Sequence, residues 1–209
     1  MNEDAPVLTI ATPEARPSRR LRSGAWELLQ TGVQALLIFL LISYLTGRFE
    51  VHQVSMEPSF HEGQRVVVSR LEMLWPNWLV GIAEAAGEER AAPVYLQRGQ
   101  VVVLYRTAEQ AGDPLIKRVI GLPGDTIELR DGAVYRNGNL VDEPYVHGAR
   151  TPCLNQCAPL TLGPNQYFVM GDNRPNSMDS RSFGPVPGDR IIGRVFLRYW
   201  PLREFAFFP

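Results

Sequence analysis

A stretch of about 20 residues without a charged side chain, residues 28–47, constrains the fold of this chain more than any other feature. It reads LLQTGVQALLIFLLISYLTG, and only Gln30 and Gln34 weaken its apolar character near the start. About 20 helical residues cross the hydrocarbon core of a bilayer. A buried helix of a soluble protein is the less favoured alternative, because few such helices are apolar on every face. We therefore predict one transmembrane anchor helix over residues 25–47.

The charges beside this stretch predict its orientation. Four arginines lie just before it, at Arg16, Arg19, Arg20 and Arg22. Only Arg48 and Glu50 lie just after it. The positive-inside rule then places residues 1–24, which are polar and rich in proline, in the cytoplasm as a disordered tail. Residues 48–209 are expected outside a plasma (inner) membrane that the chain crosses once. A cleavable signal peptide is less favoured, because the apolar stretch is long and TGRFEV is a poor cleavage site.

Beyond the anchor, the sequence is typical of short β-strands. The runs are rich in Val, Ile, Tyr and Phe, are bounded by Gly or Pro, and read FEVHQV, QRVVVSR, QVVVLYR, PLIKRVIGL, DTIELR, AVYRN, YFVMG and RIIGRVFLRYW. Asp131-Gly132 and Asn137-Gly138 are hairpin-turn dipeptides between such runs. We therefore predict a mainly β extracytoplasmic domain, an antiparallel sheet or barrel.

An insertion at residues 71–97 interrupts the strand pattern and begins with apolar and aromatic side chains. Its Trp75 and Trp78 fit a membrane surface, where indole rings are favoured, and equally fit a cap over the sheet core. The C-terminal WPLREFAFFP leaves the same two alternatives open.

The composition draws attention to one residue. Lys and Arg total 21, and Lys117 is the only lysine. A general bias toward arginine explains the other positions, but arginine cannot release its proton, whereas lysine can. Lys117 therefore marks a place where deprotonation is useful. The net charge of −1 gives no reason to expect nucleic-acid binding.

Two segments offer a nucleophile and a base. In VHQVSMEPSF, Pro58 fixes a bend after an extended run, and Ser55 at that bend can point into a groove. In PLIKRVIGLPGD, a strand would place Lys117 on one face with Leu115 and Val119. Burial on an apolar face lowers the pKa of a lysine, which suits a general base. The alternatives are a plain turn and a lysine that extends to the edge of a sheet.

A third segment, GDNRPNSMDSRSFGPVP at residues 171–187, is dense in turn-forming residues. It reads either as a long turn or as a loop that supports the base. In the second interpretation Ser177 hydrogen-bonds the lysine amine and orients it, while Asp179 and Arg181 form an ion pair that keeps the loop in shape.

In this order, SMEPSF, LIKRVIGLPGD and GDNRPNSMDSRSFGPVP resemble the signature segments of type I signal peptidases, and the resemblance spans residues 49–200. It implies a β-rich serine endopeptidase on a membrane anchor that cleaves signal peptides from exported preproteins at the outer face of the membrane. It implies Ser55 as nucleophile, Lys117 as base, Ser177 as orienting group, and Asp179 with Arg181 as supporting pair. It implies the lipid bilayer and the export translocon as partners, and neither a metal nor another cofactor.

The sequence departs from that pattern at two positions. Ser59 replaces the usual threonine after the proline, which we expect to be mild. Gln53 stands where some family members carry a serine that helps hold the oxyanion. In a strand Gln53 and Ser55 would face the same side, so its amide would join the Ser55 backbone N–H as donor.

Several further expectations concern the surroundings of the site. Phe49, Val51 and Ile116 are candidates for the walls of a substrate pocket. The three histidines, His52, His61 and His147, lie outside the matched positions and read as surface or core-edge residues. Cys153 and Cys157 form a small disulfide loop in an oxidising compartment, or else stay as two free thiols.

Two rival functions remain open at this stage. One is a Ser-Lys protease of the self-cleaving repressor type, which the apolar anchor disfavours. The other is a catalytically inactive, membrane-anchored binding protein, which only Gln53 supports.

Overall fold

The computed structural model describes residues 19–71, 96–107, 109, 112–146, 148 and 150–208. The predicted insertion at 71–97, with Trp75 and Trp78, therefore falls almost wholly outside the described residues, as does His147. The chain divides into two compact units, Met1–Ile42 and Ser43–Pro209.

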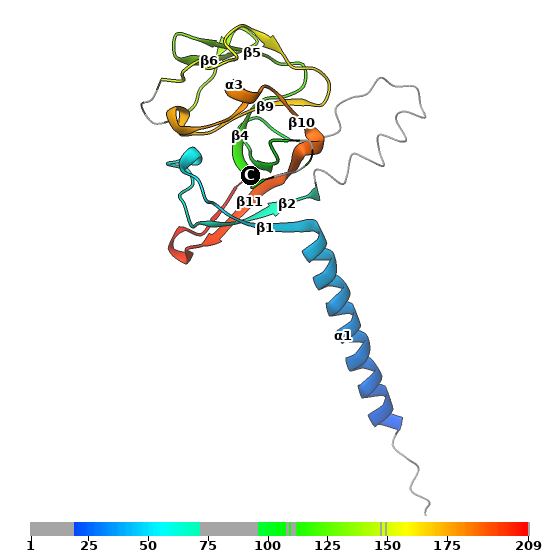
Figure 1. Cartoon of the computed structure of the whole chain (residues 1–209). Coiled ribbons are helices and arrows are strands. Elements are labelled where there is room, and N and C mark those ends of the chain that lie inside the picture. Colours follow the sequence, from blue (N-terminus) through cyan, green and yellow to red (C-terminus); the bar gives the residue numbers. More distant parts are fainter. Residues whose placement is uncertain are drawn as a thin grey trace, which may run out of the picture. The chain divides into compact units, whose positions relative to one another are not determined.

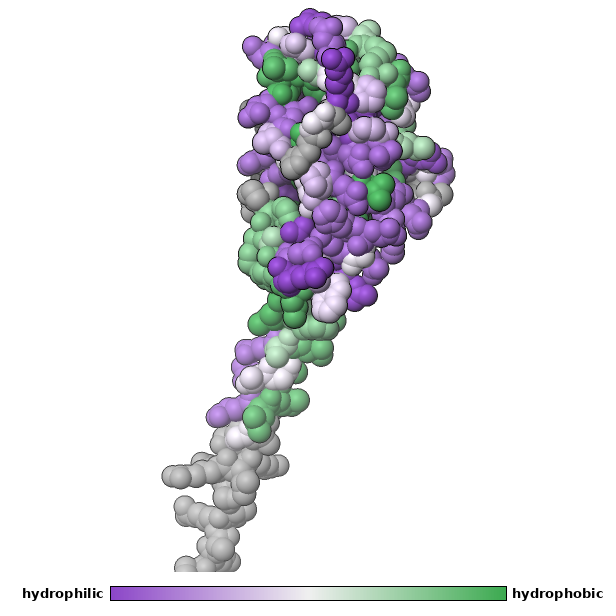
Figure 2. Space-filling view, turned by 90° about the vertical axis from the view of Figure 1, so that its left-hand side faces the viewer, coloured by the Kyte–Doolittle hydropathy of each residue, from purple (hydrophilic) through white to green (hydrophobic). Residues whose placement is uncertain are grey.

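The first unit consists, in its described part, of helix α1 (Arg19–Leu45), which continues a few residues into the second unit (Figure 1). Within it, Trp26–Leu45 is long and apolar enough to cross a membrane by length and composition. Figure 2 shows hydrophobic side chains along α1, whereas the face of the second unit in view is mainly hydrophilic.

An apolar helix is present where the anchor was predicted, and its bounds differ from the predicted ones. The helix begins at Arg19, so residues 19–24 are helical and not part of a disordered tail. Arg and Leu favour helix, and they dominate this approach to the apolar segment. At the other end, Thr46 and Gly47 belong to the first strand, since they pair with Ser69 and Val68.

The second unit is built from antiparallel strands, which confirms the mainly β prediction. The strands are β1 (Thr46–Glu50), β2 (Arg65–Ser69), β3 (Val101–Leu104), β4 (Leu115–Gly121), β5 (Thr126–Arg130), β6 (Ala133–Arg136), β7 (Asn139–Leu140), β8 (Leu160–Thr161), β9 (Gln166–Met170), β10 (Val186–Pro187), β11 (Ile191–Trp200) and β12 (Ala206–Phe207). The larger sheet has the order β1-β2-β11-β3-β4-β9-β10, with β12 paired to β11, and the smaller has the order β7-β6-β5-β8 (Figure 1).

The two predicted hairpin turns are confirmed. Asp131 and Gly132 join β5 to β6 with φ values of 54° and 78°, and Asn137 and Gly138 join β6 to β7 with φ values of 52° and 79°. Two successive positive φ angles match the right-handed twist of the paired strands.

Strand β4, which carries Lys117, contributes to three buried clusters, two of which also include residues of β9. One cluster includes Val66, Val103 and Ile116 from the larger sheet. Another includes Val119 and Val169. The third joins the two sheets through residues such as Ile120, Ile127 and Phe168. Because β4 also pairs with β3 on one side and β9 on the other, a side chain within it is held in a fixed place.

Part of the C-terminal segment covers the sheet core, which was one of the two alternatives left open by its sequence. Phe208 packs against the first cluster and stacks on Phe60, with ring centroids 4.8 Å apart. Most of its other large apolar side chains are exposed: Trp200, Leu202, Phe205 and Phe207.

Candidate active site

Ser55 lies in a 3₁₀ turn, Val54–Met56, that follows β1. The turn is anchored by Met56 and Phe60, whose side chains are fully buried, and by a hydrogen bond from the Phe60 N–H to the Met56 carbonyl. Ser55 itself is 3% exposed. The bend predicted at Ser55 is therefore present, and the surrounding core fixes the direction of its hydroxyl.

The strand argument applied to Gln53 was wrong. Strand β1 ends at Glu50, Gln53 is extended, and Ser55 already has the geometry of the turn. The two side chains therefore do not share the face of one strand. The Gln53 side chain is exposed, and the residue lines a pocket beside the site.

Lys117 lies in the middle of β4, opposite Val102 of β3, and only 1% of its surface is exposed. Its Nζ donates a hydrogen bond of 2.7 Å to Ser55 Oγ and another of 3.0 Å to the Ile116 carbonyl. The structure thus brings together a serine and a lysine that are 62 positions apart in sequence. A nucleophile in direct hydrogen-bond contact with a base is the arrangement that covalent catalysis requires.

The surroundings of Lys117 adjust its basicity. Burial lowers its pKa from 10.5 to about 8, because the ammonium loses its hydration inside the protein. The negative charges of Asp179 and Asp172 oppose this change, and the positive charge of Arg181 adds to it. The neutral amine is therefore accessible near physiological pH, as predicted from the apolar strand.

The predicted pair of Asp179 and Arg181 is present and completely buried. Arg181 Nη2 lies 2.8 Å from Asp179 Oδ2, and Arg181 Nε donates a second bond of 2.8 Å to Oδ1. Asp179 also caps the short helix α3 (Ser180–Phe183) and accepts a bond of 3.0 Å from the Gly171 N–H. Burial alone would raise the pKa of Asp179, but Arg181 and the Gly171 N–H bring it below its usual value.

Ser177 lies beside the site without the contact that was expected of it. Its hydroxyl is buried and close enough to Asp179 to help lower the pKa of that carboxyl, but it forms no hydrogen bond of good geometry with any described residue. A β-carbon at Gly171 would collide with the Ser177 side chain and with the Ser55 carbonyl oxygen. The absence of a side chain at Gly171 therefore lets Ser177 approach the nucleophile turn. Its role in orienting Lys117 stays a prediction.

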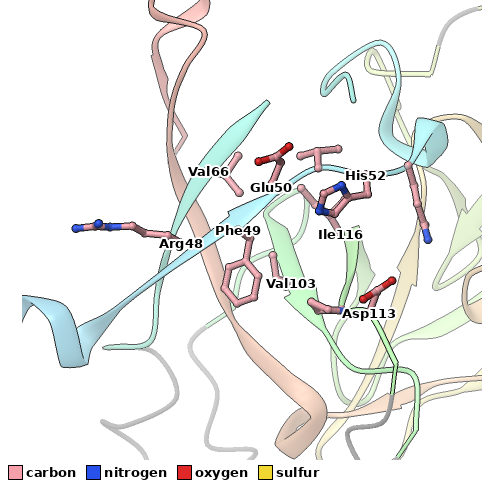
Figure 3. A pocket seen from close by; sticks show the side chains of 11 residues that line it. Arg48, Phe49, Glu50, His52, Val66, Val103, Asp113 and Ile116 are labelled. Carbon is pink, nitrogen blue, oxygen red and sulfur yellow. The ribbon is translucent and has the colours of Figure 1, made fainter. Parts of the chain in front are cut away.

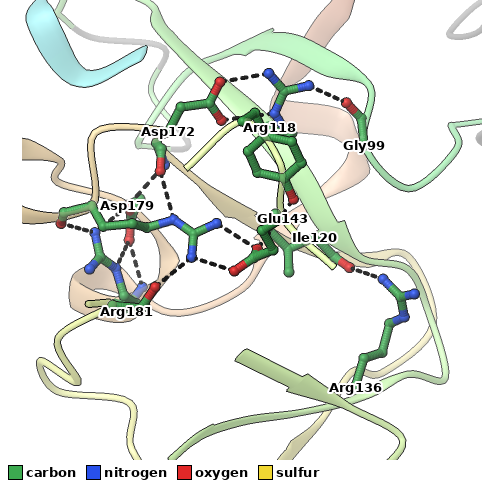
Figure 4. Close-up of polar contacts among 12 residues, drawn as sticks. Gly99, Arg118, Ile120, Arg136, Glu143, Asp172, Asp179 and Arg181 are labelled. Carbon is green, nitrogen blue, oxygen red and sulfur yellow. Dashed lines mark hydrogen bonds and ion pairs between the residues drawn. The ribbon is translucent and has the colours of Figure 1, made fainter. Parts of the chain in front are cut away.

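Three further residues of the loop were not singled out from the sequence. Asn173 ties the loop to the nucleophile, since its N–H donates to the Ser55 carbonyl at 3.1 Å and its Nδ2 to the Val54 carbonyl at 3.1 Å. Asp172 accepts two bonds from Arg118, of 2.6 and 2.8 Å (Figure 4).

Arg174 is the third. It is a buried cation held by Glu143 through bonds of 2.6 and 2.8 Å. The adjacent charge pattern NRPNSMDSR could have drawn attention to Arg174, but nothing in the sequence identifies Glu143 as its partner.

A pocket of about 210 Å³ opens next to the nucleophile turn (Figure 3). Its lining includes all three predicted wall residues, Phe49, Val51 and Ile116. The remaining lining residues are Arg48, Glu50, His52, Gln53, Val66, Val103, Asp113 and Pro114. The pocket therefore combines an apolar wall from the sheet with ionisable side chains.

The other candidate residues lie apart from the Ser55–Lys117 pair. His61 is exposed and lies 3.5 Å from Glu57, and His52 is exposed on the pocket lining. Cys153 and Cys157 are joined in a disulfide, which confirms the first of the two alternatives given for them. Among the residues that the structure describes, no cluster of His, Cys, Asp or Glu is suited to a metal ion.

Comparison with known proteins identifies the family of this chain. The chain is 42% identical over 110 residues to the probable signal peptidase I-2 of Synechocystis sp., a match that covers 51% of this chain and 49% of that protein. It thus spans about half the length of that relative. It is 28% identical over 195 residues to signal peptidase IB of Staphylococcus aureus, covering 86% of this chain and 91% of that protein.

A crystal structure of a signal peptidase I from Enterococcus faecalis V583 aligns with 34% identity and a TM-score of 0.40, over 47% of this chain and 95% of that one. The sequence model of the family described as "Signal peptidase, peptidase S26" matches residues 25–200. This match covers most of the chain, which therefore belongs to the S26 family of signal peptidases, which are serine endopeptidases.

Proposed function

We propose that this protein is a membrane-anchored signal peptidase in which Ser55 attacks the scissile bond and Lys117 is the general base. One observation carries the proposal. The Nζ of a lysine that is 1% exposed lies 2.7 Å from the Oγ of a serine that is 3% exposed. A structural lysine at the edge of a sheet would instead direct its amine into water.

The proposed reaction proceeds in two halves. Neutral Lys117 accepts the Ser55 proton while Oγ forms a bond to the scissile carbonyl carbon. The carbon–nitrogen bond then breaks, and the Lys117 ammonium gives its proton to the leaving amine. Water next attacks the acyl-enzyme, again with Lys117 as base, and releases Ser55. The Asp179–Arg181 pair and Ser177 support Lys117 in this scheme.

The developing oxyanion requires hydrogen-bond donors. We assign this role to the Ser55 backbone N–H and, as second donor, to the Gln53 amide, which lies two residues away on the pocket lining. Gln53→Ala should lower kcat by at least about tenfold if its amide donates in the transition state. An unchanged kcat would remove Gln53 from the site.

The substrates in this proposal are the signal peptides of exported preproteins. An extended peptide would add to a sheet edge, with one small side chain directed into the pocket beside Phe49 and Ile116. The family resemblance implies small residues, mainly alanine, one and three positions before the cut.

The proposed topology places α1 across the plasma membrane with the N-terminus in the cytoplasm and the catalytic unit outside, close to the export translocon. Arginines before the span support this orientation. Protease treatment of intact cells should spare residues 1–24. Removal of these residues by the protease would contradict the proposed topology.

The activity is tested by purified full-length variants on a preprotein, with the N-terminus of the product sequenced. Ser55→Ala and Lys117→Arg should each lose several orders of magnitude in kcat/KM. Alanine has no hydroxyl to attack the scissile bond, and arginine keeps the charge but cannot accept a proton. Ser59→Thr is the matched control, since it keeps the hydroxyl that meets Arg118 and should retain activity. Near-normal cleavage by Lys117→Arg would contradict the proposed mechanism.

A further inference from the structure

The segment of residues 151–157, called here the disulfide segment, lies between β7 and β8 and outside both sheets. Its disulfide joins Cys153 to Cys157, with the Cα atoms 5.3 Å apart. Thr151 is buried, but residues 152–155 and Cys157 are exposed and Gln156 is half-buried. Packing of its own side chains therefore contributes little to its shape, which depends on the covalent link and on hydrogen bonds.

Those hydrogen bonds reach helix α3, which lies in the loop of residues 171–187. A helix of four residues leaves its last carbonyl groups without partners inside the helix. The backbone N–H groups of Asn155 and Gln156 both donate to the Arg181 carbonyl, at 3.0 and 3.1 Å. Asn155 Nδ2 donates to the Ser182 carbonyl at 3.2 Å. The disulfide segment thus supplies the donors that complete the end of α3.

The same segment also accepts hydrogen bonds from two buried arginines. Arg181 Nη1 donates to the Pro152 carbonyl at 3.2 Å, and Arg174 Nη1 donates to Thr151 Oγ1 at 2.6 Å. The side chains of Arg174 and Arg181 are both 0% exposed. Burying a cation costs folding free energy unless its N–H donors have hydrogen-bond acceptors. The positions of the Pro152 carbonyl and Thr151 Oγ1 therefore help to fix the positions of the two guanidinium groups.

From Arg181 the contacts lead to the reacting groups. Arg181 holds Asp179, and Asp179 accepts a bond from the Gly171 N–H (Figure 4 shows the ion pair). Two residues later, the Asn173 N–H donates to the Ser55 carbonyl at 3.1 Å. The disulfide segment is thus joined to the nucleophile turn by an unbroken series of hydrogen bonds, the chain between Gly171 and Asn173, and one ion pair.

We propose that the disulfide segment is a positioning element for catalysis, in which the Cys153–Cys157 link holds the groups that fix α3 and the Asp179–Arg181 pair beneath Ser55 and Lys117. The inference rests on the proposed function of that serine and lysine. It assigns to an exposed loop an effect on the rate of the chemical step as well as on the stability of the fold.

The experiment compares one polypeptide in two covalent states. The sequence contains two cysteines, so a phosphine reductant applied to the full-length protein in detergent acts on this disulfide alone. Reduction should lower kcat on a preprotein about tenfold with KM unchanged, the scale expected when reacting groups are misplaced by a fraction of an ångström to an ångström. The midpoint of the kcat–pH profile should rise, because water that enters a loosened site reduces the desolvation of Lys117. Reoxidation should restore both.

The Cys153→Ser/Cys157→Ser double variant should reproduce the reduced enzyme and should not respond to the reductant. Equal kcat and equal pH midpoints in the two states would overturn the inference. So would a lower melting temperature without a change in either kinetic quantity, because the role would then be structural only. A rise in KM alone would also overturn it. The underlying proposal is tested separately, because activity retained by Lys117→Arg would contradict the roles of Ser55 and Lys117 whatever the effect of reduction.

Discussion

Replacing Lys117 by methionine should make the protein more stable at pH 7 while abolishing its activity. Lys117 is 1% exposed, and burial lowers its pKa from 10.5 to about 8. At 1.36 kcal/mol per pH unit, the buried ammonium costs about 3 kcal/mol relative to an exposed lysine. Methionine has a similar length and no charge, so it removes this cost and fills the same space.

The gain is reduced by lost hydrogen bonds. The Lys117 amine donates to Ser55 Oγ and to the Ile116 carbonyl, and each bond is worth about 1 kcal/mol. The expected net gain is therefore about 1 kcal/mol, or a rise in Tm of roughly 2–4 °C for a chain of this size.

The pH dependence identifies the cause. Below pH 8 the folded and unfolded states both carry the proton, so the folded wild type bears the whole cost of the buried charge. Between pH 8 and 10.5 the folded state has released the proton and the unfolded state has not, so wild-type stability rises with pH. The advantage of Lys117→Met should then shrink and reverse by pH 10.5.

Thermal unfolding followed by circular dichroism in detergent, at pH 6.5 to 10.5, measures this difference. Arg65→Met is the control, because it removes an exposed cation paired with Glu50 and should show no such change with pH. A Met variant that is less stable at pH 7, or a difference in Tm that does not vary with pH, would refute the reasoning.

Two further predictions concern the support of the site. Gly171→Ala should lower activity and destabilise the fold by about 1–3 kcal/mol, because its β-carbon would displace Ser177 and the nucleophile turn. Gly163→Ala is the control, since its β-carbon would meet only a flexible glutamine, and equal melting temperatures of the two variants would contradict the prediction. Glu143→Gln should lower the free energy of unfolding by about 3 kcal/mol or more, because it leaves the buried Arg174 without its charge partner. Glu128→Gln, in the more exposed pair with Arg130, is the control, and an equally small effect of both substitutions would refute the prediction.

The sequence allowed the strands to be predicted for a physical reason, whereas the roles of Ser55 and Lys117 were taken from the family resemblance. Alternation of β-branched residues reports directly on which side of a strand is buried, and Lys117 falls inside such a run. The bounds of α1 and the two-residue strands β7, β8, β10 and β12 were beyond such a pattern, because two residues carry no periodicity. They form only because a neighbouring strand offers its backbone.

What the sequence could not specify at the site depends on local geometry. The alternation rule was extended to Gln53, but buried Met56 and Phe60 turn the chain out of the strand beforehand. The contacts of the Ser177 hydroxyl depend on sub-ångström placement that a motif does not contain. The partnership of Arg174 with Glu143 spans 31 positions in a chain with many arginines, so charge alone could not select it.

The central claim, that neutral Lys117 activates Ser55, is tested most directly by the pH dependence of kcat/KM for preprotein cleavage by the wild-type enzyme. The pKa of Lys117, lowered by burial to about 8, predicts that the rate rises with pH and levels off above about 8. A rate that climbs steadily to pH 10 would show a lysine that keeps its ordinary pKa. A midpoint near 6.5, the usual pKa of histidine, would show that another residue is the base.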